Sequence, residues 1–85
     1  MTAGSYEAVL AEVREIVARQ FGVNVEELTE ATMREDVDGW DSVSFPGLLL
    51  GIEDECRVSL PPEEAVAIET IGDLARLVHA VKNPS

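Results

Sequence analysis

The feature that most constrains the fold of this chain is a helical spacing of apolar residues. Between residues 5 and 21, the positions that share one helical face are Val9, Val13, Ile16, Val17 and Phe21. A second such face follows Thr70 and consists of Ile71, Leu74, Leu77, Val78 and Val81. This spacing is typical of amphipathic helices that bury one side. No strand pattern of any length competes with it, so the chain is predicted to be all-α.

Residues that begin and end helices bound these two segments. Ser5 is suited to cap the first helix, and Gly22 is suited to end it. Thr70, with Asp73 three residues later, resembles a capping box at the start of the last helix. Both helices are therefore predicted with defined ends.

The segment after the first helix is predicted to be mostly loop. Asn24, with Glu27 three residues later, predicts a capping box and one short turn. Residues 29–40 carry no sustained periodicity and are predicted to form a long loop. Three apolar residues are expected to hold this loop to the core: Leu28, Met33 and Val37.

A second helix is predicted to begin near Asp41 or Ser42 and to run to about Cys56. Its expected core face comprises Leu48, Leu49, Ile52 and Cys56. Pro46 and Gly47 interrupt it, because proline costs about 3 kcal/mol in a helix interior and glycine about 1 kcal/mol. The cost of proline is smaller in the first turn, where backbone amides lack partners anyway. A kinked or late-starting helix is therefore expected, with Phe45 folded inward to fill the space beside the proline.

The remaining elements complete a small bundle. Val58 and Leu60 alternate in an extended link, and a pair of prolines then precedes a short helix at residues 63–66. The prediction is a single domain, residues 1–85, that folds as a small four-helix bundle. It has three main helices and one short helix, with the long loop between helices one and two.

The charge balance excludes several classes of function. The chain has 17 acidic and 6 basic residues, a formal net charge of −11. This field repels nucleic acids and anionic lipids and favours partners with basic surfaces. No apolar run is long enough for a membrane span, and the N-terminus lacks the pattern of a signal peptide, so a cytoplasmic protein is expected. Cys56 is the only cysteine, and no Cys/His cluster has zinc spacing, so no metal is expected.

The Asp41-Ser42 pair is the strongest candidate site. A serine at a helix start is most simply a cap, but the free amides and partial positive charge there would also stabilise a phosphodiester attached to Ser42. A catalytic serine is disfavoured, because the only histidine is His79, far along the chain, and no nucleophile-elbow motif surrounds the serine. An enzyme is therefore not predicted.

Four segments in order give the chain a family resemblance. They are "EVREIVARQFGVNVEELTEATMREDVDGWDSV", the apolar helix that ends in "IEDEC", the link "RVSLPPEE", and "TIGDLARLV". Together they resemble the acyl carrier protein family over essentially the whole chain. The resemblance implies that a phosphopantetheinyl transferase attaches 4′-phosphopantetheine from CoA to Ser42 and recognises Asp41. The thiol of the arm, and no side chain of this protein, would then hold the cargo as a thioester.

The resemblance also implies a partner surface around the serine. Val43 matches the usual leucine after the family serine, which contacts partners. The expected surface is completed by an exposed apolar residue and acidic flanks: Asp38, Leu50, Glu53 and Asp54. A monomer is expected, with a loading enzyme and a downstream acyltransferase or synthase as further partners.

The sequence alone leaves three interpretations of the function open. The first is an acyl carrier of a specialised pathway, for polyketides, lipids or related compounds, because Phe45, Pro46 and Cys56 depart from the family pattern. The second is an aminoacyl or peptidyl carrier that an adenylating enzyme loads. The third, of another class, is an unmodified interaction module with the carrier fold.

Overall fold

Helices account for all the regular structure in the part of the chain that the computed structural model describes, residues 5–83. The elements in chain order are α1 Tyr6–Phe21, η1 Val25–Glu27, η2 Arg34–Asp36, α2 Phe45–Cys56, α3 Pro62–Ala65 and α4 Ile71–Lys82, where η denotes a 3₁₀ turn. The predicted all-α class, with three main helices, one short helix and a long first loop, is confirmed.

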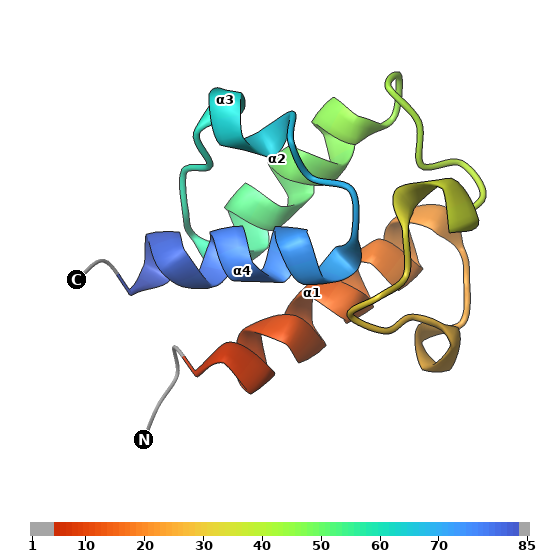
Figure 1. Cartoon of the computed structure of the whole chain (residues 1–85), viewed down its shortest axis with the longest axis horizontal. Helices are drawn as coiled ribbons and strands as arrows, with labels where there is room; N and C mark the ends of the chain where they lie inside the picture. The colour runs from red at the N-terminus through yellow and green to blue at the C-terminus, as the bar shows by residue number, and fades with distance from the viewer. Residues whose placement is uncertain (1–4, 84–85) are drawn as a thin grey trace.

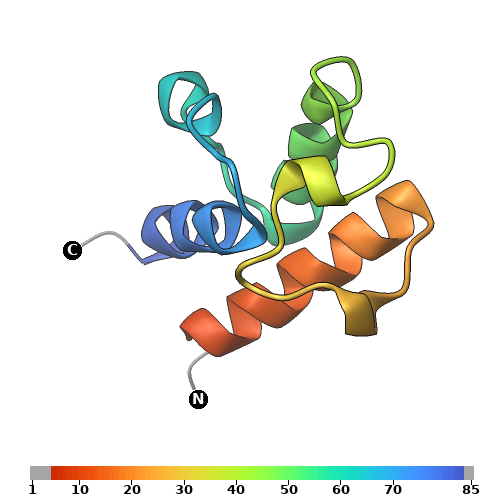
Figure 2. The same cartoon turned by 45° about the vertical axis from the view of Figure 1, so that its right-hand side comes forward.

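The three long helices bury a common apolar core. α1 packs against both α4 and α2, and Figures 1 and 2 show α1 and α4 crossing at the base of the molecule with α2 and α3 above them. The largest fully buried side chains are Val9, Val13 and Val17 of α1, Leu48 and Ile52 of α2, and Ile71, Leu74 and Val78 of α4. These are the positions that the helical spacing predicts, because burial of apolar area is the main favourable term in folding.

The predicted helix ends are largely confirmed. Ser5 Oγ accepts a hydrogen bond from the Ala8 amide at 3.2 Å, and Gly22 ends α1 with a left-handed φ of 67°. In α4, the Asp73 amide donates to Thr70 Oγ1 at 2.9 Å, and the Asp73 carboxylate accepts from the Thr70 amide at 3.2 Å, which completes the capping box.

The capping box predicted at Asn24 is half formed. Its side chain accepts from the Glu26 amide at 3.1 Å, but within residues 5–83 the Glu27 side chain makes no return bond. The turn that follows is a 3₁₀ helix of three residues. The predicted short turn and its Asn24 cap are therefore confirmed, and the predicted bond from Glu27 is wrong.

The long loop is attached to the start of α4 by backbone hydrogen bonds. The Ile71 amide donates to the Thr32 carbonyl, and the Gly72 amide donates to the Glu30 carbonyl, each at 2.9 Å. These bonds satisfy amides of the first turn of α4, which have no partner within the helix. Gly72 permits the approach, because a Cβ there would lie 2.9 Å from the Glu30 carbonyl oxygen.

The side chains that hold this loop differ in part from the prediction. Leu28 and Val37 are buried as predicted, but Met33 is 37% exposed. Met33 is held through its backbone, which forms an isolated bridge with Thr70, so its side chain is not needed as an anchor. The guanidinium of Arg14 in α1 reaches the loop from below, donating to the Leu28 carbonyl at 2.7 Å and the Val25 carbonyl at 2.9 Å.

Helix α2 begins later than the serine. It starts at Phe45, so the predicted start near Asp41 or Ser42 is wrong and the late start expected from the proline is confirmed. Pro46 lies in the first turn, where its missing N–H removes no bond within the helix. The short helix α3, in contrast, begins at Pro62, one residue before its predicted start.

Candidate functional site

Ser42 lies in an exposed turn between the long loop and α2. The turn spans residues 41–44, and the Phe45 amide at its end donates to the Asp41 carbonyl at 2.9 Å. Within residues 5–83, the Ser42 hydroxyl makes no hydrogen bond, so it is not the cap that its position near a helix start suggests. A free, exposed hydroxyl in this place is accessible to a modifying enzyme.

Asp41 holds the turn in shape. Its Oδ1 atom accepts hydrogen bonds from the Val43 amide at 3.0 Å and the Ser44 amide at 2.9 Å. These bonds favour the charged form and lower the pKa of Asp41 below its usual value, the bond from Ser44 contributing most, while desolvation acts in the opposite direction. The carboxylate therefore orders the backbone that follows Ser42 while it stays exposed.

Ser44 completes this turn and was not singled out by the sequence. Its Oγ accepts from the Asp41 amide at 3.0 Å and donates to the Gly39 carbonyl. Asp41 and Ser44 thus exchange bonds as the two ends of a capping box do. The three-residue spacing of Asp41 and Ser44 could have predicted this exchange from the sequence. The exchange leaves the hydroxyl of Ser42, which lies between them, without a partner among residues 5–83.

An aromatic stack lies under the approach to the turn. The Trp40 side chain is 5% exposed, and its ring centre lies 6.1 Å from that of Phe21 and 6.3 Å from that of Phe45. The inward position predicted for Phe45 is confirmed, and Trp40 packs between its ring and that of Phe21. Gly39, with a φ of 95°, turns the chain just before the tryptophan.

The predicted partner residues lie in different environments. Val43 is 86% exposed and Leu50 is 66% exposed, which is unusual for large apolar side chains. Asp38 and Asp54 are exposed, whereas Glu53 is half-buried and its Oε2 atom accepts from the Leu60 amide at 2.8 Å. Glu53 therefore also fixes the link after α2. The sequence did not single out Val66, whose side chain is 71% exposed at the end of α3.

Two other side chains that are reactive in many proteins, His79 and Cys56, have structural contacts here. His79 stacks edge-on against Tyr6, with ring centres 5.8 Å apart. Cys56 is buried, and burial raises the pKa of its thiol to about 11, with a further contribution from the nearby Glu12 carboxylate. Cys56 is thus a core residue, as predicted, and is unsuited to carry an acyl group.

No group of three or more His, Cys, Asp and Glu side chains in residues 5–83 could hold a metal ion. None of the helices described there has the length and apolar character needed to cross a membrane.

Comparison with known proteins gives a consistent result. The family described as "Phosphopantetheine attachment site" matches residues 11–78. The acyl carrier protein of Wolinella succinogenes is 32% identical over 75 residues, which cover 88% of this chain and 99% of that protein. The solution NMR structure of holo acyl carrier protein from Geobacter metallireducens superimposes with a TM-score of 0.77 at 28% identity, covering 87% of this chain and 85% of that one.

The helical bundle of this chain, with an exposed serine turn before its second long helix, is the arrangement of a carrier protein. The chain belongs to the phosphopantetheine-attachment family of acyl carrier proteins. Proteins of this family are carriers and not enzymes. They bear a covalently attached 4′-phosphopantetheine arm and interact with a modifying transferase and with enzymes that handle acyl groups. The free Ser42 hydroxyl, in a turn that Asp41 orders, fits the attachment of such an arm.

Proposed function

We propose that Ser42 is the attachment point and that this chain carries an acyl intermediate for partner enzymes of a specialised biosynthetic pathway, for polyketides, lipids or related compounds. The observation that carries the proposal is the free hydroxyl of Ser42, exposed between two residues of a turn that bond to each other. In the attachment step, a phosphodiester bond to Ser42 Oγ would form as the pyrophosphate bond of CoA breaks. Adenosine 3′,5′-bisphosphate would leave, and the serine proton would pass to a base of the transferase. When bound, the arm supplies the thiol that forms the thioester.

The acidic surface supports recognition by basic partners. Asp41 stays charged and exposed beside Ser42, and we propose that the transferase reads it there. Asp38 and Asp54 are exposed, and the uncovered side chains of Val43 and Leu50 supply apolar contacts. Glu53 adds charge while its carboxylate holds the link. Surfaces of this type favour fast encounter and weak binding, which suits a carrier that must leave each partner.

The wider setting is also part of the proposal. Residues 1–85 form one carrier domain, which is supported by the family match over residues 11–78. The domain acts as a monomer in the cytoplasm, with a loading enzyme and a downstream acyltransferase or synthase as partners. The departures at Phe45, Pro46 and Cys56 support a pathway other than housekeeping fatty-acid synthesis.

The attachment step can be tested by intact mass. The purified chain is incubated with CoA and a broad-specificity phosphopantetheinyl transferase, and one added arm is expected. Ser42→Ala should abolish the addition, because it removes the only atom that forms the bond. Ser59→Ala, which changes an exposed serine elsewhere, should keep it.

Two outcomes contradict the proposal. An unchanged mass for the native chain would favour an unmodified interaction module with the carrier fold. A mass addition that persists in Ser42→Ala would place the arm on another residue.

A further inference from the structure

A groove lies between α3 and α4, outside the residues assigned to the attachment site and the partner surface. Its volume is about 530 Å³. Four apolar side chains from α4 and from the link that precedes it contribute to its lining: Ala67, Ile68, Leu77 and Ala80. Ala67 and Ala80 are exposed and Leu77 is half-buried, so apolar surface remains open to a ligand at this place.

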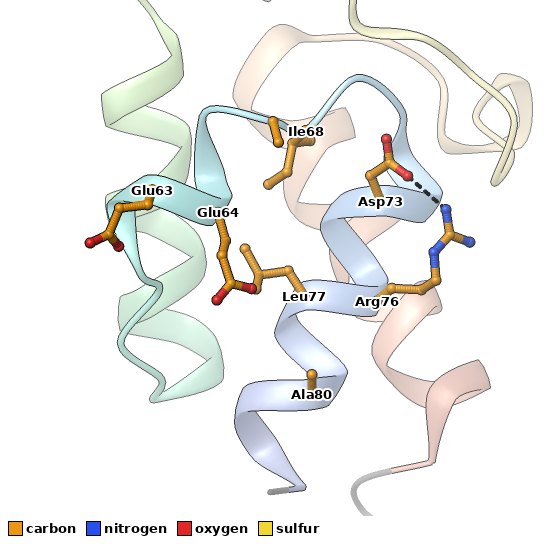
Figure 3. Close-up of a pocket in the computed structure, with 8 residues that line it drawn as sticks. Glu63, Glu64, Ile68, Asp73, Arg76, Leu77 and Ala80 are labelled. Carbon is orange, nitrogen blue, oxygen red and sulfur yellow. Dashed lines mark hydrogen bonds and ion pairs between the residues drawn. The ribbon is translucent and has the colours of Figure 1, made fainter.

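The charges around the groove are predominantly negative and partly uncompensated. Among the described residues that line the groove, Arg76 is the one cation, and it is already engaged, with Asp73 at 2.7 Å and Glu30 at 3.8 Å. Figure 3 shows the bond between Arg76 and Asp73, and shows Glu64 extending from α3 toward Leu77. Within residues 5–83, the side chains of Glu63 and Glu64 form no ion pair or hydrogen bond.

This combination selects one kind of occupant. A phosphate or other anion would be repelled by Glu63 and Glu64, and an acyl chain gains nothing from carboxylates at its edge. No group of side chains in the described residues is arranged to hold a metal ion. A ligand that presents apolar side chains to the floor and cations to α3 satisfies both features, and an amphipathic helix with a basic polar face has this form.

We propose that the α3–α4 groove binds a basic amphipathic helix of a partner protein. One or two apolar side chains of that helix contact Leu77 and Ala80, and its lysines or arginines pair with Glu63 and Glu64. Such a contact involves neither Ser42 nor the apolar side chains that flank it, so a partner can hold the carrier here while the arm is used elsewhere. The shallow groove and exposed ion pairs make the contact weak and salt-sensitive.

The test uses nuclear magnetic resonance of the full ¹⁵N-labelled chain and a defined probe. The probe is a helical peptide of about 18 residues with leucine on one face and lysine on the other, and its control replaces lysine with glutamate. The lysine peptide should shift the amide signals of Ala67, Leu77 and Ala80 most, and the glutamate peptide should shift none of them.

Matched variants separate the groove from general attraction to an acidic protein. Glu63→Gln with Glu64→Gln should weaken binding by about two- to tenfold. Glu26→Gln with Glu27→Gln removes the same charge from exposed positions on η1 and should leave affinity nearly unchanged. Ala80→Lys places a cation at the floor and should also weaken binding. Circular dichroism checks that each variant is folded.

Several results would overturn the proposal. These are an absence of binding, signal shifts concentrated in residues 38–54, or equal weakening by the two glutamine pairs. Acyl loading of the arm that shifts the groove signals and blocks the peptide would assign the groove to cargo. Because Ser42→Ala should keep peptide binding, failure here is distinguishable from failure of the attachment proposal.

Discussion

At the end of α2, the backbone conformation of one residue determines which side chain is most stable there. Arg57 ends α2 with a φ of 58°, the only left-handed residue other than glycine in the part of the chain that the structure describes. Its amide donates to the Glu53 carbonyl and so closes the helix. Glycine is the usual residue there because a Cβ is strained in that conformation.

Arg57→Gly should stabilise the protein by about 1 kcal/mol, because it removes this strain. The measurement is the free energy of unfolding in urea. Arg57→Ala is the matched control, since it removes the same charge and keeps the Cβ, and it should give little gain. Equal gains from both variants would assign the effect to charge instead of to the backbone.

At the scale of elements, glycines in two helices have opposite roles. Gly51 lies inside α2, and a Cβ there would meet nothing within 4 Å. Gly72 lies in the first turn of α4, against the Glu30 carbonyl and the Arg76 side chain. The first position exposes backbone without benefit, whereas the second is needed for the loop to reach α4.

Gly51→Ala should therefore stabilise the protein by about 0.5–1 kcal/mol, because alanine loses less backbone freedom on folding. Gly72→Ala should destabilise it by about 1–3 kcal/mol, because its Cβ would push the loop from α4. Thermal unfolding of both variants gives the comparison. A loss for Gly51→Ala, or no change for Gly72→Ala, would contradict these packing arguments.

At the scale of the whole molecule, stability is opposed by the net charge of −11. The ion pairs of residues 5–83 involve exposed or half-buried side chains, such as Arg19 with Glu55 at 2.7 Å and Lys82 with Glu12 at 3.5 Å. Such pairs add little, so most of the carboxylates repel one another without compensation.

Adding salt should therefore raise the melting temperature. Between about 10 mM and 200 mM NaCl the screening length falls from about 30 Å to below 10 Å, and each kcal/mol gained raises the melting temperature by about 4–8 °C. Glu26→Gln with Glu27→Gln should show a smaller rise, because less repulsion remains to be screened. A melting temperature that falls with salt would show that ion pairs outweigh repulsion.

The sequence alone determined the features that depend on local chemistry and on spacing. The apolar faces of α1 and α4, the caps at Ser5 and Thr70 and the late start of α2, with Pro46 in its first turn, follow from short-range geometry. The family resemblance was also readable there, because its motifs are ordered along the chain.

Features that depend on residues far apart in sequence became visible only in the folded chain. The backbone of Met33 holds the loop in place of its side chain, because the chain passes beside Met33 again at Thr70 and the two residues form a bridge. The α3–α4 groove exists because a one-turn helix packs beside α4 and leaves Leu77 partly uncovered. The free hydroxyl of Ser42 depends on Ser44 bonding back to Gly39 and Asp41, and the distinction between these two serines required the three-dimensional path of the turn.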